Sequence, residues 1–368
     1  MFRGLALVMI FINHVPGTIY EHFTNRNFGF SDAAEAFVFM SGLAAGLAYS
    51  SGFRSGSVLA AIAKIWARAR QLYFAHLTMT MLSLAIFAAA AYWFGLPEVL
   101  TRNNIPSLFQ QPLGTIIGIP LMLHQFGYLN ILPLYIVLLL ATPLIIIAGL
   151  RRPYVVLALS ILLWALAGQY RLNFPNYPTS GGWFLNPLSW QVLFVVGLLS
   201  GMAMKKQEQF VPFSPLLFGL AAAFVVFVLL WMRIPTLAEA GRSMLSLLHD
   251  AGLPSYITGF NKSYLALPRL LHALALFYVV SSMASVRVLA GTRAAAPLRL
   301  LGRQGLAVFS VGTVLSLFLQ AVKTPRMPDP LFDGLCLGTG LLLLLALAWM
   351  LTRVAELRAS QRQAKTAD

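Results

Sequence analysis

The chain has 368 residues, of which 59% are hydrophobic and 10% are charged, and its mean hydropathy is +0.77. Soluble domains carry about 25% charged residues, so this composition excludes a soluble globular protein. The high apolar content also excludes a disordered chain. The formal net charge is +15. The Lys and Arg residues of the chain lie in short gaps between apolar runs, and this pattern is typical of a membrane protein rather than of a nucleic-acid-binding protein.

Ten segments are apolar enough to cross a bilayer as helices of about 20 residues. With the N-terminus inside, this topology places 17 Lys and Arg residues on the inner side and 8 on the outer side. The positive-inside rule therefore favours an all-α polytopic membrane protein with about ten transmembrane helices and both termini in the cytoplasm. We expect a single transmembrane domain over residues 1–353 and a cytoplasmic tail over 354–368. The expected spans lie near residues 4–20, 33–50, 74–94, 129–149, 154–170, 188–204, 215–233, 264–284, 306–322 and 331–352.

The first span carries two ionisable side chains, which are costly in a bilayer and mark functional sites by default. Arg3 and His14 are eleven residues apart. They therefore share one helix face and lie about 16 Å apart along the axis. Pro16 and Gly17 predict that the helix ends or kinks just beyond Asn13 and His14, which leaves polar groups deep in the membrane. The alternatives are that His14 only satisfies a neighbouring backbone group, or that this short segment is a cleaved signal peptide.

The second span begins with two acidic residues, Asp32 and Glu35, on one helix face. Asp32 is a plausible N-cap, and capping alone is one explanation for its presence. Glu35 lies one turn into the apolar run and requires a partner. An imidazole beside this carboxylate would be oriented and made more basic, and His14 and His22 are the candidates.

Two further spans place basic residues near their ends. Arg68 and His76 share a helix face in the third span, with Arg70 beside them, and arginine is well suited to bind phosphate. Plain anchoring at the inner surface is the alternative. In the eighth span, Arg269 and His272 could bind a substrate carboxylate, although Arg269 could equally reach the outer interface.

The remaining polar features are less specific. Residues 171–187, which include Trp183, mix aromatic and amide side chains in a composition suited to holding a sugar, or to an interfacial aromatic belt. Ser41 and Gly42 form a small-residue patch that allows close helix packing. No metal-binding or phosphate-loop motif is present. We expect the other outer polar residues to be solvated, namely His124, His249, Asp250 and Asp333.

The run from Arg3 to His14 resembles the signature of the membrane acyltransferase family 3 superfamily. The longer stretch from Arg3 to Gly46 is similar to the OpgC family in particular, and Arg68-Ala-Arg70 is similar to the basic motif of the superfamily. OpgC proteins are implicated in succinylating osmoregulated periplasmic glucans. This region also resembles the heparan-type transmembrane acetyltransferases, in which the catalytic histidine lies nearer to His22. The choice between His14 and His22 therefore stays open.

The resemblance implies transfer of an acyl group, most simply succinyl, from cytoplasmic acyl-CoA to a hydroxyl of a periplasmic glucan in the inner membrane of a bacterium. Acyl-CoA would be a co-substrate, and no cofactor would be bound permanently. Oligomeric state is not implied, and neither is nucleic-acid binding. The implied catalytic residues are His14 or His22 as the base, Asn13 as oxyanion donor and Glu35 as the orienting group. Those expected to bind acyl-CoA are Arg3, Arg68, Arg70 and His76, and those expected to bind the other substrate groups are Asp32, Trp183, Arg269 and His272.

Other functional classes fit the same composition. A bundle with His, Glu and Arg near the membrane midplane could be a proton-coupled solute transporter, although no internal repeat supports this. Acetylation of another extracytoplasmic glycan is a variant of the same chemistry. An unrelated membrane-bound O-acyltransferase that pairs a histidine with an asparagine would use His124.

Overall fold

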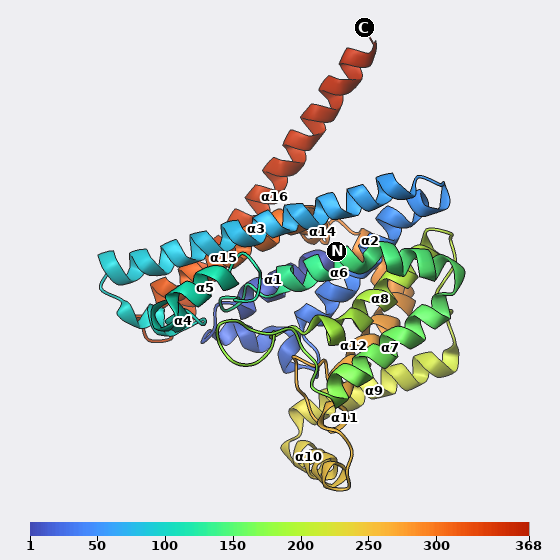
Figure 1. The fold of residues 1–368 in the computed structure, drawn as a ribbon, viewed down its shortest axis with the longest axis horizontal. Helices are drawn as coiled ribbons and strands as arrows, with labels where there is room; N and C mark the ends of the chain where they lie inside the picture. The colour runs from blue at the N-terminus through green and yellow to red at the C-terminus, as the bar shows by residue number, and fades with distance from the viewer. Residues whose placement is uncertain (368) are drawn as a thin grey trace. The chain divides into compact units, whose positions relative to one another are not determined.

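The chain is predominantly helical in the computed structural model, which describes residues 1–367 (Figure 1). No strand forms among those residues, and one isolated bridge joins Pro175 to Gly182. Within residues 1–367, seven helices are long and apolar enough to cross a membrane, or eight when the bent pair α12 (Leu267–Ser282) and α13 (Ala284–Gly291) is taken as one span. The predicted fold class, an all-α polytopic membrane protein, is confirmed.

Each of the ten expected segments overlaps a helix, although α1 (Phe2–Asn13) ends before the expected end of the first segment at residue 20. Seven of these helices pass the length and hydropathy criteria for a span. The segment expected near residues 264–284 is α12, which passes the criteria only together with the bent continuation α13, and two more segments form shorter apolar helices. The total of ten crossings and the location of both termini therefore stay predictions. The seven long helices are α2 (Ala33–Arg54), α3 (Val58–Trp93), α6 (Ile131–Arg151), α8 (Pro187–Met204), α9 (Pro215–Arg233), α15 (Gly305–Lys323) and α16 (Pro330–Ala367); the divided pair is α12 (Leu267–Ser282) and α13 (Ala284–Gly291); the shorter two are α1 (Phe2–Asn13) and α7 (Pro153–Gln169).

The connections contain short helices of their own. Proline stands in the first two positions of many helices, where its missing N–H costs nothing and its fixed φ favours the helical conformation. The connecting helices are η1 (Ile19–Phe23), η2 (Asn25–Asn27), η3 (Pro97–Thr101), α4 (Pro106–Gln110), α5 (Pro112–Gly118), α10 (Pro235–Asp250), α11 (Ser255–Thr258) and α14 (Ala296–Arg303).

The chain divides into two compact units. Unit 1 comprises Met1–Thr24, Met81–Val99 and Ala284–Asp368, and unit 2 comprises Asn25–Thr80 and Leu100–Met283. In unit 1, α1 packs against α14 and α15, and α16 packs against α14 and α15. In unit 2, α2 packs mainly against α8; α6 and α12 also contact α2, α7 contacts α8, and α9 packs against α12. The expectation of one domain over residues 1–353 stays a prediction.

The α2–α8 contact of unit 2 depends on glycine. A Cβ added at Gly42 or Gly46 of α2 would overlap the backbone of α8, and a Cβ at Gly197 or Gly201 of α8 would overlap the backbone of α2. Each helix thus carries two glycines four residues apart, the spacing that lets membrane helices approach closely. The packing interpretation of Ser41 and Gly42 is confirmed.

We expect Gly42→Val to destabilise the protein by about 3 kcal/mol or more, because the added atoms meet backbone that cannot move aside without separating the helices. Gly219→Val on α9 is the matched control, since no atom lies within 4 Å of a Cβ at that position. Thermal denaturation of both variants in detergent measures the difference. Equal stability of the two variants would contradict the close packing.

Candidate functional site

The first cluster of expected site residues lies at the C-terminal end of α1, in unit 1. The helix ends at Asn13, and His14 is its C-cap residue. Val15 is fully buried, and Gly17 has a φ of +78°, a left-handed conformation that favours glycine. The helix end that Pro16 predicts is therefore confirmed.

Side chains of α15 support the broken backbone after α1. Gln320 Nε2 donates to the carbonyl oxygen of His14 at 2.6 Å, and Lys323 Nζ lies 3.5 Å from the carbonyl oxygen of Gly17. Lys323 is also 2.6 Å from Asp333 Oδ1 on α16. The expectation that Asp333 is solvated is wrong, because Asp333 is only 2% exposed and its carboxylate pairs with Lys323. Non-helical backbone at membrane depth requires such partners.

The other two residues expected near this break differ in their surroundings. Asn13 Oδ1 lies 2.7 Å from the hydroxyl oxygen of Thr24, which is buried. His22 is exposed in the 3₁₀ helix η1. Of the two candidate bases, His14 is half-buried at a helix end that Gln320 contacts, and His22 is exposed in a connecting 3₁₀ helix.

Arg3 lies at the opposite end of α1 from His14. Its guanidinium faces Gly305, the first residue of α15, because a Cβ at Gly305 would stand 3.0 Å from Arg3 Nε. Gly302 of α14 is next to the Arg3 Cβ. The separation of Arg3 from His14 along a straight helix is about 16 Å.

The basic residues of the third span lie on one continuous helix. α3 has 36 residues. It is therefore about 54 Å long and exceeds the hydrocarbon core of about 30 Å. Arg68 Nη1 donates to Gln71 Oε1 at 2.6 Å, and Arg70 is exposed. His76 is buried, and neither of its ring nitrogens forms a hydrogen bond within residues 1–367. Helix α3 belongs to unit 2 as far as Thr80.

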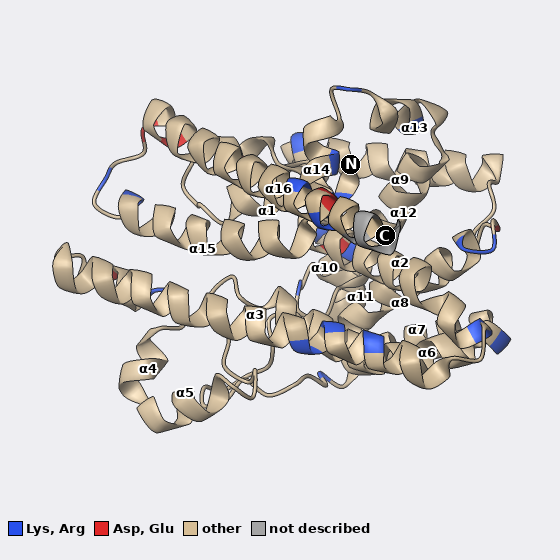
Figure 2. Ribbon diagram, turned by 90° about the horizontal axis from the view of Figure 1, so that it is seen from above, with Lys and Arg blue, Asp and Glu red and all other residues tan. Residues whose placement is uncertain are grey.

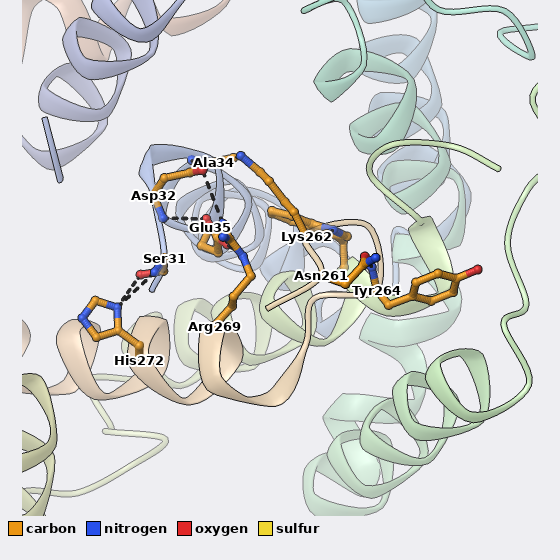
Figure 3. A network of polar contacts seen from close by, with 10 residues as sticks. Ser31, Asp32, Ala34, Glu35, Asn261, Lys262, Tyr264, Arg269 and His272 are labelled. Atoms are coloured by element: carbon orange, nitrogen blue, oxygen red, sulfur yellow. Dashed lines mark hydrogen bonds and ion pairs between the residues drawn. The ribbon is translucent and has the colours of Figure 1, made fainter. Parts of the chain in front are cut away.

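A second cluster is a buried charge network in unit 2, at the N-terminus of α2 (Figure 3). Arg269 Nε and Nη2 donate to Glu35 Oε1 at 2.9 and 2.6 Å. Arg269 Nη2 also lies 3.3 Å from Asp32 Oδ2, to which Lys262 Nζ donates as well. The charges of the network therefore cancel. The N-terminus of α2 supplies two carboxylates, α12 supplies the guanidinium, and the loop before α12 supplies the ammonium group.

The same carboxylates cap α2. Asp32 Oδ1 accepts from the N–H of Ala34 at 2.8 Å, and Glu35 Oε2 accepts from the N–H of Asp32 at 2.9 Å, which is a capping box. Burial alone would raise the pKa of Asp32, but the charges of Lys262 and Arg269 outweigh it and hold that pKa below its usual range. The N-cap prediction for Asp32 is confirmed.

The structure corrects the expected partner of Glu35. Its side chain is fully buried, and both of its oxygens are already engaged, one by Arg269 and one by the backbone of Asp32. Arg269, rather than His14 or His22, supplies the required partner. Arg269 in turn already binds two carboxylates, which leaves it poorly suited to bind a third from a substrate.

His272 lies on α12 one turn beyond Arg269. Its Nδ1 is 2.7 Å from the hydroxyl oxygen of Ser31 and 3.3 Å from the Ser31 nitrogen, and its ring packs on Gly29. The buried imidazole therefore fixes the segment that leads into α2. This contact gives His272 a positioning role that its sequence spacing does not reveal.

The loop between α7 and α8 places its aromatic residues differently from expectation. Trp183 is 3% exposed and contacts Phe174 with the ring centroids 5.2 Å apart. A buried indole cannot offer its face to a sugar in this conformation. Phe184 is 51% exposed, and Lys262 Nζ lies 5.7 Å from the centroid of its ring.

His124 also departs from expectation. It is buried rather than solvated, and its Nε2 lies 2.8 Å from the hydroxyl oxygen of Ser107 and 3.3 Å from the carbonyl oxygen of Asn104. Burial lowers the pKa of His124. His249 and Asp250 are exposed, as expected. Within residues 1–367, no group of three or more His, Cys, Asp or Glu side chains could hold a metal ion.

Sequence reasoning did not select Lys262, Gln320 or Lys323. Gln320 carried the clearest signal, because an amide within an apolar span requires a hydrogen-bond partner. Lys262 and Lys323 stand at span ends, where a basic residue is ordinary, and only the fold shows their carboxylate partners.

The protein-family model described as OpgC protein matches residues 1–356 of the chain. Comparison with curated proteins gives no match, and comparison with solved structures gives none either. The matched range contains every candidate site residue named above and all of the helices except the last eleven residues of α16.

Proposed function

Because the chain belongs to the OpgC protein family, we propose that it is a membrane acyltransferase that moves a succinyl group from acyl-CoA to a hydroxyl of a periplasmic glucan. The family match over residues 1–356 carries the proposal. Family membership suggests an OpgC-type acyltransferase, and the long apolar helices suggest a multi-pass membrane protein. The bacterial inner membrane, the succinyl donor and the glucan acceptor belong to the proposal. Acyl-CoA would be a co-substrate, with no permanently bound cofactor.

The proposed reaction needs a base, an oxyanion donor and a bound donor molecule. In our proposal, His14 removes the proton of the acceptor hydroxyl while the hydroxyl oxygen attacks the thioester carbonyl. The amide of Asn13 stabilises the oxyanion, the carbon–sulfur bond breaks, and the CoA sulfur leaves as a thiol with the proton that His14 carried. The braced helix end supports this assignment, because a catalytic group must be held in a fixed position.

The other site residues divide into two groups. Arg3, Arg68, Arg70 and His76 are proposed to bind acyl-CoA, with the arginines facing its phosphates. Asp32, Glu35, Arg269 and His272 are proposed to position the N-terminus of α2 and the segment before it, since their contacts are to one another and to that backbone. The acceptor side would include the loop that holds Trp183.

The experiment that tests the reaction follows the release of free CoA thiol by the purified protein in detergent. Succinyl-CoA and acetyl-CoA are each supplied with and without a β-glucan acceptor. We expect glucan-dependent release from succinyl-CoA. A folded, monodisperse protein that releases thiol from neither donor would overturn the proposal, and solute uptake by proteoliposomes without any thioester would then support transport.

Gln320→Glu tests whether the bracing of His14 matters for turnover. The substitution keeps size and shape but replaces the N–H donor with a carboxylate that repels the His14 carbonyl. We expect kcat to fall about tenfold or more, because a catalytic group displaced by about 1 Å can cost a hundredfold, while KM for the acyl donor stays unchanged. Gln169→Glu, at an exposed position of α7, is the matched control. An unchanged kcat in Gln320→Glu would show that the bracing is dispensable.

A further inference from the structure

A group of arginines around α14 in unit 1 has no role in the site described above. The sequence contains no acidic residue between Asp250 and Asp329, and four arginines fall between α12 and α15. Figure 2 shows basic residues on α14 and on the linker before it. None of the four forms an ion pair in the part of the chain that the structure describes. They are Arg287, Arg293, Arg299 and Arg303, and all except the half-buried Arg299 are exposed.

Helix α14 presents two of these arginines together. Leu298 and Gly302 face Gly4 of α1 so closely that a Cβ on Gly4 would overlap the Leu298 carbonyl. Arg299 and Arg303 follow these two positions by one residue, so they lie one turn apart on the neighbouring face of the helix. Two like charges at this spacing destabilise a helix. An anion bound between them would remove that repulsion.

Arg299 is held in place by the backbone. Its Nη1 donates to the carbonyl oxygens of Ala290 and Thr292, each at 2.7 Å. These acceptors are neutral, so they fix the guanidinium without cancelling its charge. A pre-oriented guanidinium loses less side-chain entropy when it binds an anion.

Arg3 places a third guanidinium beside the end of α14 and the start of α15. Its Nε and Cζ lie 3.0 and 3.2 Å from the position that a Cβ on Gly305 would occupy. Gly305 begins α15, whose N-terminus has no capping side chain and no acidic residue in its first turn. The positive end of that helix dipole therefore adds to the charge of Arg3 and of Arg303, two residues before Gly305.

We propose that Arg3, Arg299 and Arg303 bind the phosphate groups of the acyl-CoA donor. The inference rests on the proposed function, which already assigns Arg3 to the donor phosphates, and it adds Arg299 and Arg303 beside Arg3 within unit 1. Arginine binds phosphate bidentately, and CoA carries a pyrophosphate and a phosphomonoester. His14 lies on the same helix as Arg3, about 16 Å away along its axis. Phosphates held by these three arginines therefore let the acyl-bearing arm extend along α1 toward His14.

The test measures binding and needs no turnover. The dissociation constants of CoA and of ADP are measured by calorimetry for the full chain in lipid-free detergent. Arg303→Ala removes one exposed charge that forms no hydrogen bond within residues 1–367. Gly305→Ala changes no charge but places a Cβ 3.0 Å from Arg3 Nε, which forces the guanidinium to shift by a few tenths of an ångström. We expect both variants to weaken CoA and ADP binding about tenfold, the effect of losing roughly 1.4 kcal/mol, and to raise KM for the acyl donor more than they lower kcat.

Two sets of controls separate the sources of the effect. The double variant Arg151→Ala/Arg152→Ala, at exposed positions of another basic connection, is expected to leave CoA binding unchanged, and Arg68→Ala/Arg70→Ala shows what α3 contributes. Anionic lipid supplies the same phosphate chemistry, so each titration is repeated in nanodiscs with and without phosphatidylglycerol. Unchanged CoA binding in folded Arg303→Ala and Gly305→Ala would overturn the inference. So would loss of phosphatidylglycerol binding alone, which would assign the arginines to lipid. A wild-type protein that binds CoA through these arginines without releasing thiol would overturn the proposed reaction instead.

Discussion

Arg269→Ala is expected to lower the free energy of unfolding by on the order of 3–5 kcal/mol, because it removes one partner of a buried ion pair. Glu35 is fully buried and would lose the guanidinium that faces it at 2.6 Å. Asp32 would keep Lys262 as its partner. The unfolding of the purified variant in detergent, followed against temperature or denaturant, measures the loss.

Two further variants identify the cause. Removing both charges, in Arg269→Ala/Glu35→Gln, should recover much of the stability, because no unpaired buried charge remains. Arg269→Lys should recover only part of it, since an ammonium cannot reproduce the contacts of two guanidinium nitrogens with Glu35. An Arg269→Ala protein as stable as the wild type, but unable to prefer succinyl-CoA to acetyl-CoA, would instead make Arg269 a substrate ligand.

The sequence predicts features of this fold that depend on neighbouring residues. Apolar runs locate the helices, Pro16 predicts the end of α1, and Asp32 predicts the N-cap of α2. The small residues at Gly42 predict close packing, although the sequence does not name α8 as the partner. The helix end and the N-cap arise from contacts within a few turns of one helix, whereas the packing at Gly42 involves the backbone of a second helix.

The sequence does not predict features that depend on contacts between residues far apart in the chain, such as the partner of a buried carboxylate or the burial of a loop residue. Glu35 requires a partner because a buried carboxylate is costly, but the residue that satisfies it lies 234 positions away, on α12. Asp333 and His124 look like solvated loop residues until the fold buries them beside Lys323 and Ser107. Trp183 and Phe184 are adjacent in the sequence, and only the loop conformation determines which ring is exposed.

The choice between the two histidines is likewise a question of position. His14 and His22 are both plausible bases from residue type and spacing. In the structure, His14 caps the C-terminus of α1, and its carbonyl oxygen accepts a hydrogen bond from Gln320. The preceding residue, Asn13, accepts a hydrogen bond from the hydroxyl of Thr24. His22 is exposed in η1. A general base must keep its geometry through the reaction, and this requirement favours His14.

We therefore expect His14→Ala to lower kcat for glucan-dependent CoA release by about 10²–10⁴-fold, the usual contribution of a positioned general base. KM for the acyl donor should change little, because the proposed phosphate contacts lie at the other end of α1. His22→Ala should retain most of the wild-type kcat. Both variants must first match the wild type in thermal stability, so that a loss of activity reflects chemistry rather than folding. The reverse pattern, with turnover lost in His22→Ala and kept in His14→Ala, would move the base to η1 and leave the bracing by Gln320 with a structural role alone.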